Sequence, residues 1–218
     1  MSPSEAWQES PVVIEGLPFV LAPTALAGMA WWAGWGAVAV LCAGAALFTV
    51  WFFRNPRRTV PDDPRAIVSP ADGKVLSVER LFESRVLKDD VQRVSIFMGL
   101  TDVHVNRIPS DGRIVGRYYY PGKFLSAFKE KASLDNEQQA LVLETPDGRR
   151  VMFVQIAGLV ARRIVTWVRE GDQVERGRRY GLIRFGSRMD VYLPLNVQVT
   201  VKPGDRVAGA SSVLGVWP

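Results

Sequence analysis

The hydrophobic residues divide the chain into two unlike parts, an uninterrupted apolar run near the N-terminus and a shorter-period pattern after it. No charged residue occurs between residues 16 and 53, a run of 38 residues. A helix that crosses a bilayer needs about 20 apolar residues. The run therefore predicts either one membrane span with a lead-in or a helical hairpin of two passes. Residues 35–53 are the better predicted span, because Pro18, Pro23 and Gly28 are expected to break the first half into a re-entrant turn.

The residues that flank the apolar run indicate how it is anchored. It carries tryptophans typical of a membrane–water interface, namely Trp31, Trp32, Trp35 and Trp51. Arg54, Arg57 and Arg58 follow directly, and the positive-inside rule places such residues on the cytoplasmic side. A secretory signal peptide fits poorly, because no basic segment precedes the run and the run is too long. We therefore expect residues 1–53 to anchor the chain in the cell membrane, with the remainder in the cytoplasm.

After a linker over residues 54–66, short runs rich in Val, Ile, Tyr and Phe predict β-strands. The expected strands are 67–68, 74–78, 93–98, 113–120, 140–144, 150–156, 180–185 and 197–201. Turn signals such as Asp72-Gly73 separate them, a spacing typical of a β sandwich or barrel. Helices are expected at residues 124–131 and 159–166. Residues 67–218 are therefore predicted to form a mostly β domain with a few helices.

One segment near the C-terminus suggests a known kind of β module. Gly171-Asp172-Gln173-Val174, followed by Gly177, resembles the turn pattern of lipoyl-type modules, so lipoyl-like C-terminal hairpins are expected. Such modules carry their cofactor on a lysine at a hairpin tip. The next expected hairpin contains Phe185-Gly186-Ser187-Arg188 and no lysine, which argues against a carrier module.

Composition and charge narrow the function classes. Cys42 and His104 are the single cysteine and the single histidine, so an internal disulfide and a Cys-based zinc site are excluded, and a His-rich metal site is disfavoured. Residues 1–53 hold three glutamates and no lysine or arginine; since the whole chain is +5, the remainder is +8. A basic domain beside a membrane anchor favours an anionic lipid surface. Because there is no nucleic-acid-binding motif, nucleic acid is not an expected partner.

Seven segments, taken in order, resemble the short-form phosphatidylserine decarboxylase family. They are FFRNPRR (52–58), SPADGKV (69–75), IFMGLTDVHVNRIPSDG (96–112), YYPGKFLSAF (119–128), LDNEQQAL (134–141), QIAGLVARRIV (155–165) and YGLIRFGSRMDVYLP (180–194). The resemblance covers roughly residues 50–215. A Gly-Ser pair or an Asp-Gly turn alone is weak evidence, but this order of segments behind a membrane anchor is specific.

The resemblance implies a proenzyme that cuts itself between Gly186 and Ser187, leaving subunits 1–186 and 187–218. The Ser187 hydroxyl attacks the Gly186 carbonyl, and elimination and hydrolysis then convert Ser187 into a covalently bound pyruvoyl group. That group forms a Schiff base with the amine of phosphatidylserine and accepts electrons as CO2 leaves, giving phosphatidylethanolamine. The resemblance also implies a homodimer, and archaetidylserine is an alternative substrate.

The resemblance implies roles for particular polar residues in this chain. His104 is the candidate for proton transfer, since its usual pKa is about 6.5. Asp72, in SPADG, is the expected carboxylate partner in self-cleavage, although plain Asp-Gly turn chemistry also explains it. Asp102 is a second candidate, two residues before His104 and therefore expected on the same face of a strand.

Two departures from the long-form members limit what can be transferred. This chain has Phe-Gly-Ser-Arg where long forms have Leu-Gly-Ser-Thr, and it has Asn106-Arg107 after His104 where they have a second histidine. Either His104 acts in both cleavage and decarboxylation, or Arg107 supplies a charge. Arg188 is expected either to hold a carboxylate or phosphate of the substrate or to be solvated.

A different class of function is a non-catalytic, membrane-tethered β module. That module predicts an intact chain of 24.2 kDa, whereas the enzyme predicts two fragments. A denaturing gel of the purified protein distinguishes these two interpretations.

Overall fold

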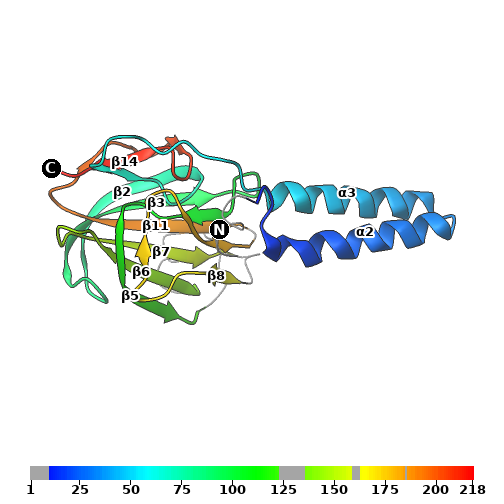
Figure 1. Ribbon diagram of the computed structural model, residues 1–218, viewed down its shortest axis with the longest axis horizontal. Coiled ribbons are helices and arrows are strands. Elements are labelled where there is room, and N and C mark those ends of the chain that lie inside the picture. The colour runs from blue at the N-terminus through cyan, green and yellow to red at the C-terminus, as the bar shows by residue number, and fades with distance from the viewer. Residues whose placement is uncertain (1–9, 123–135, 159–162, 185) are drawn as a thin grey trace. The chain divides into compact units, whose positions relative to one another are not determined.

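The computed structural model describes residues 10–122, 136–158, 163–184 and 186–218. The chain forms two compact units, Met1–Arg57 and Arg58–Pro218. The N-terminal unit is helical, and the C-terminal unit is built of β-strands (Figure 1). The helix expected at residues 124–131 lies outside the described residues.

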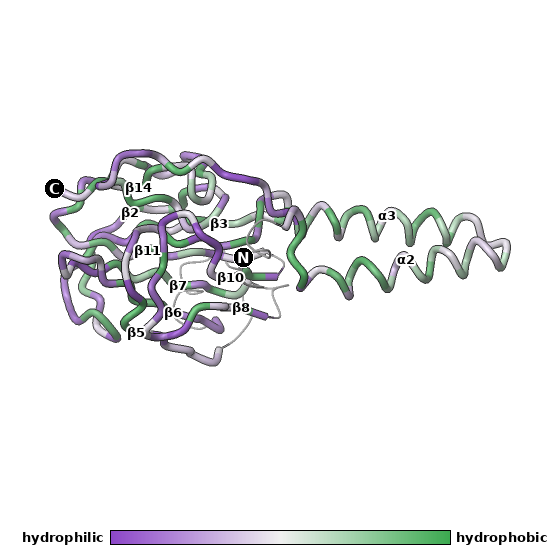
Figure 2. Tube along the Cα trace, in the orientation of Figure 1, coloured by the Kyte–Doolittle hydropathy of each residue, from purple (hydrophilic) through white to green (hydrophobic). Residues whose placement is uncertain are grey.

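The N-terminal unit is a hairpin of two apolar helices. A short 3-10 helix, η1 (Ile14–Gly16), leads into α2 (Leu17–Trp32), and α3 (Gly36–Phe52) packs against α2. The turn between them contains Gly34, whose φ of 77° suits glycine. Figure 2 shows that both helices are hydrophobic or neutral along most of their length. A hairpin was one of the two arrangements that the apolar run predicts.

The expected break in the first half of the apolar run is wrong. Pro18 lies in the first turn of α2, where its missing N–H has no helical acceptor to lose. Pro23 lies inside α2, and the helix continues through it to Trp32. Proline's fixed φ of about −65° is helical, so a single proline removes a hydrogen bond without ending the helix.

The lengths of the two helices also reverse their expected order as membrane spans. Residues Ile14–Trp32 form 19 helical residues that are long and apolar enough, by length and composition, to cross a membrane. Residues Gly36–Phe52 form 17, which is shorter. At 1.5 Å per residue, these lengths correspond to about 28 and 26 Å, against a hydrocarbon core of about 30 Å. In the described N-terminal unit, the segment Ile14–Trp32, which joins η1 and α2, is therefore the one closer in length to a membrane span.

Among the described residues, the C-terminal unit contains three antiparallel sheets, and the largest has eight strands in the order β13-β2-β3-β11-β7-β6-β5-β9. Two three-stranded sheets, β1-β14-β12 and β4-β10-β8, accompany it. The strands are β1 (Ala66–Val68), β2 (Gly73–Glu83), β3 (Asp89–Met98), β4 (Val105–Arg107), β5 (Gly112–Tyr120), β6 (Gln138–Glu144), β7 (Arg150–Ala157), β8 (Ile164–Thr166), β9 (Gln173–Val174), β10 (Arg179–Ile183), β11 (Ser187–Pro194), β12 (Gln198–Val199), β13 (Arg206–Val207) and β14 (Val213–Val216).

The main hydrophobic core lies on one face of the large sheet. Side chains alternate between the two faces of a strand, and on β11 the residues Met189, Val191 and Leu193 all enter this core. Ser187 precedes them in the same alternation and is fully buried. Arg188 and Asp190 therefore lie on the opposite face, where a second, smaller cluster of apolar residues packs against Tyr192.

The expectation of a mostly β fold with an apolar N-terminal helix is confirmed, and two local expectations are wrong. Residues Ile164–Thr166, expected to end a helix, form β8, consistent with the strand preference of β-branched residues. The strands around Gly186 do not form a hairpin with each other, because β10 pairs with β4 and β8 whereas β11 pairs with β3 and β7.

Candidate active site

The Gly186–Ser187 junction joins two sheets and opens the central strand of the larger one. Gly186 has a φ of 63°, a left-handed conformation that strains any residue with a β-carbon. A β-carbon at Gly186 would meet nothing within 4 Å, so the backbone conformation and not crowding favours glycine here. Ser187 is fully buried, and across the sheet its direct neighbours are Met98 on β3 and Ala157 on β7.

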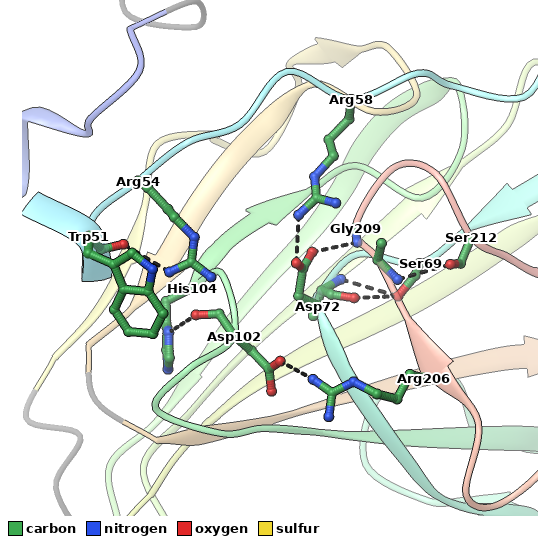
Figure 3. A network of polar contacts seen from close by, with 12 residues as sticks. Trp51, Arg54, Arg58, Ser69, Asp72, Asp102, His104, Arg206, Gly209 and Ser212 are labelled. Atoms are coloured by element: carbon green, nitrogen blue, oxygen red, sulfur yellow. Dashed lines mark hydrogen bonds and ion pairs between the residues drawn. The ribbon is translucent and has the colours of Figure 1, made fainter.

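His104 reaches this junction from the segment that leads into β4. Its side chain is buried, and the Gly186 N–H donates to His104 Nε2 at 3.3 Å. His104 Nδ1 lies 3.0 Å from the backbone oxygen of Asp102, seen also in Figure 3. A carbonyl oxygen only accepts, so these partners assign the neutral tautomer with its proton on Nδ1. The structure thus brings together His104, Gly186 and Ser187, with a basic nitrogen at the junction.

Asp102 contacts His104 through its backbone and not through its carboxylate. It lies in a turn before β4, so the expectation that Asp102 and His104 share a strand face is wrong. The Asp102 carboxylate accepts from the Gly99 N–H at 2.9 Å and pairs with Arg206 on β13 (Figure 3). Both contacts join Asp102 to the segment that carries His104 or to the neighbouring strand β13.

Asp72 has different partners from those expected. Its carboxylate pairs with Arg58 at 2.5 Å and accepts from the Gly209 N–H at 2.7 Å (Figure 3). In the described part of the chain, its contacts are with these two residues and not with His104. Gly73 fixes the position of the turn, because a β-carbon there would lie 2.1 Å from the Phe97 backbone oxygen. The structure therefore does not bring the Asp72 carboxylate into contact with the histidine.

Arg107 lies at the centre of a group of positive charges. It is buried, its guanidinium donates to the Gly177 carbonyl at 3.0 Å, and it stands directly opposite Arg179 on β10. Burial lowers the pKa of Arg107 to about 10, helped by the charges of Arg58 and Arg179, while Asp72 acts in the opposite direction. Like charges on facing strands disfavour each other, so this group is suited to an anion.

The sequence left open whether Arg188 holds a carboxylate or phosphate of the substrate or is solvated, and the structure shows that it is not solvated. Its side chain is 2% exposed and its guanidinium donates to Asp190 Oδ1 at 2.6 Å and to Ser95 Oγ at 2.7 Å. Successive residues of a strand point to opposite faces, so Arg188 lies on the face of β11 away from Ser187. The side chain is committed to a buried ion pair there.

Two contacts of the site were not predicted from the sequence. The Ser187 hydroxyl donates to the Met98 sulfur at 3.3 Å, and Asn106 also contacts that sulfur. Met98 ends the run Ile-Phe-Met, where it reads as an ordinary core residue. The one sequence feature that could have indicated these contacts is Asn106, which lies between Val105 and Arg107 in β4. A buried polar side chain there needs a hydrogen-bond partner.

Comparison with known proteins agrees with this geometry. The family model described as phosphatidylserine decarboxylase matches residues 45–215. The chain is 46% identical over 211 residues to a phosphatidylserine decarboxylase proenzyme from Geotalea uraniireducens, covering 97% of this chain and 99% of that protein. It is 47% identical to the proenzyme of that name from Syntrophus aciditrophicus, covering 96% and 99%, and 48% identical to one from Symbiobacterium thermophilum, covering 94% of each.

The match to the Geotalea uraniireducens protein covers 97% of this chain, and Asp72, His104 and the Gly186–Ser187 junction lie within residues 45–215 of the family model. The resemblance read from the seven sequence segments is confirmed. The chain belongs to the phosphatidylserine decarboxylase family.

Proposed function

We propose that this chain cuts itself between Gly186 and Ser187 and then decarboxylates phosphatidylserine to phosphatidylethanolamine and CO2. The observation that carries the proposal is the placement of His104 Nε2 at the junction, 3.3 Å from the Gly186 nitrogen. A buried serine hydroxyl is a weak nucleophile until a base takes its proton. His104, held as the tautomer that leaves Nε2 unprotonated, is the proposed base.

The proposed cleavage uses only this chain and water. Ser187 Oγ attacks the Gly186 carbonyl carbon, its proton passes through His104 to the Ser187 nitrogen, and the amide becomes an ester. Removal of the Ser187 Cα proton then breaks the Cβ–Oγ bond, and Oγ leaves within the Gly186 carboxylate. Water hydrolyses the dehydroalanine that remains and releases ammonia, which leaves a pyruvoyl group at residue 187.

The surroundings of Ser187 fit such a group. The residue is fully buried between Met98 and Ala157, one flexible and one small neighbour, on the strand at the centre of the sheet. A pyruvoyl group supplies an electron sink for the charge that develops as CO2 leaves. His104 is proposed to return a proton to the substrate carbon, and Arg107 to attract the anionic headgroup.

Asp72 is proposed to act through the arginines and not through His104. Its carboxylate holds Arg58 and offsets part of the charge on Arg107. Loss of that carboxylate would leave the arginine group more positive and less well ordered. Asp102 is proposed to position the His104 loop through its contacts with Gly99 and Arg206.

We also propose that the helical unit anchors the enzyme in the cell membrane, with the β unit on the cytoplasmic side. Arg54, Arg57 and Arg58 follow α3, and basic residues favour the cytoplasmic face. Removal of residues 1–53 should release the protein from membranes while leaving self-cleavage intact. Residual binding to anionic vesicles should weaken with salt. A folded truncated protein that fails to cleave would contradict this division of roles.

The decarboxylase proposal is tested with Ser187→Ala, which removes both the nucleophile and the source of the ketone. Wild-type protein in detergent should release CO2 from phosphatidylserine and form phosphatidylethanolamine. The variant should stay at 24.2 kDa and form neither product. Decarboxylation by folded, uncut Ser187→Ala would overturn the proposal.

A further inference from the structure

Ser187 stands at one end of a chain of hydrogen bonds between side chains. Its hydroxyl donates to the Met98 sulfur at 3.3 Å, and the Asn106 side-chain nitrogen lies 3.8 Å from the same sulfur. Gln155 Nε2 donates to Asn106 Oδ1 at 2.8 Å, and the Thr166 hydroxyl donates to Gln155 Oε1 at 3.0 Å. Apart from Thr166, which is partly buried, these residues are fully buried.

The sulfur of Met98 fixes the direction of every donor in this chain. A thioether sulfur accepts hydrogen bonds and has no proton to give. Asn106 must therefore turn its NH2 group to the sulfur, which leaves its oxygen to accept from Gln155. The Ser187 hydroxyl likewise donates to Met98 in the uncut chain, and its proton turns from the sulfur to His104 only when the proposed cleavage begins. The rotamer of the nucleophile is thus set by an acceptor that is too weak to be a base.

The same contact changes its chemistry when residue 187 matures. In the proposed cleavage, Oγ departs with the Gly186 carboxylate and the Ser187 β-carbon becomes the methyl of the pyruvoyl group. Met98 then faces a methyl where it faced a hydroxyl. A strong acceptor at position 98 would keep the Asn106 donor but lose the Ser187 donor and face a methyl instead, and a buried polar group without its full set of partners is costly. A purely apolar side chain would suit the methyl and give the earlier hydroxyl no acceptor.

We propose that Met98 is a positioning residue with two successive tasks, as acceptor for the Ser187 hydroxyl before cleavage and as apolar wall for the pyruvoyl methyl afterwards. The inference rests on the proposed function, since it needs the cut at Ser187. A thioether meets both demands because it is apolar, polarizable and able to accept weakly. Fixing the orientation of a reacting group in advance is a recognised source of rate.

Two substitutions should separate the two tasks. Met98→Leu keeps the apolar volume and removes the acceptor, so the decay of the 24.2 kDa precursor on a denaturing gel should slow about three- to tenfold. Once matured, Met98→Leu should keep more of the wild-type turnover of phosphatidylserine per pyruvoyl group than Met98→Gln keeps. Met98→Gln keeps an acceptor, so it should cleave faster than Met98→Leu, yet its turnover per pyruvoyl group should fall about tenfold.

Met189→Leu is the matched control, because the Met189 sulfur lies in the same core but accepts from the Tyr180 hydroxyl at 3.6 Å, whereas the Ser187 hydroxyl donates to Met98. It should change neither rate by more than about twofold. The inference is overturned if Met98→Leu cleaves at the wild-type rate, if both steps slow equally in both variants, or if neither variant folds, since Met98 would then be only structural. Absence of cleavage in the wild type would instead overturn the proposed function.

Discussion

The buried pair of Arg188 and Asp190 gives the sharpest stability prediction, because both side chains are almost fully excluded from solvent, at 2% and 0% exposure. Arg188→Met removes one charge and leaves the other in the sheet. Breaking a buried ion pair in this way typically costs about 3–5 kcal/mol. Burial lowers the pKa of Arg93, but Asp190, Tyr192 and Glu79 together raise it above its usual value, so Arg93 also stabilises Asp190. We therefore expect the lower end, about 3 kcal/mol, a large part of a total of about 5–15 kcal/mol.

The double variant Arg188→Met/Asp190→Val removes both charges at similar volume. Replacement of a whole buried pair is often neutral or stabilising. The free energy of unfolding of the double variant should therefore differ from that of the parent by less than about 1 kcal/mol, which corresponds to a large coupling energy between the two residues. The assay is urea unfolding followed by tryptophan fluorescence, in a Ser187→Ala background that keeps the chain uncut. An Arg188→Met variant that loses less than about 1 kcal/mol would refute the reasoning.

Three further predictions concern cleavage and assembly. His104→Ala should accumulate the 24.2 kDa precursor, with cleavage slowed about 10²–10⁴-fold on a time-course gel; cleavage at the wild-type rate would make His104 structural. Asp72→Asn should slow the same reaction, whereas Asp63→Asn, at an exposed carboxylate paired with Arg65, should not; equal rates for both would remove Asp72 from the mechanism. The fragment 187–218 should co-elute with 1–186 in size-exclusion chromatography and separate only in denaturant, because β11 is paired on both sides; separation without denaturant would contradict that.

Much of the secondary structure could be predicted from the sequence, because it depends on short-range patterns of residues. The strand runs and their turns gave most of the long strands, since side-chain preference and turn chemistry are local properties. The continuation of α2 through Pro23 could not be predicted from the sequence. Proline disfavours a helix, but the helix preference of the surrounding residues outweighs that free-energy cost here. Pairing of β10 and β11 with separate sheets depends on strands far away in the sequence.

The candidate site likewise contains residues that the sequence predicted and contacts that it did not. Ser187, Gly186 and His104 could be named from the segments they occupy, and the structure brings them together. The face on which Arg188 lies was in principle available from strand alternation, but only once β11 was known to begin at Ser187. The contact of Ser187 with Met98 and the pairing of Asp72 with Arg58 join residues 89 and 14 positions apart. Such contacts follow from topology, which no short motif encodes.

The measurement that tests the central claim most directly is the intact mass of the purified, active protein. The account predicts two polypeptides, residues 1–186 and 187–218. The smaller one should be lighter by one ammonia than a fragment starting with free serine, and it should resist N-terminal sequencing. Active protein that consists only of the uncut 24.2 kDa chain, or a small fragment with a free serine at its N-terminus, would contradict the account.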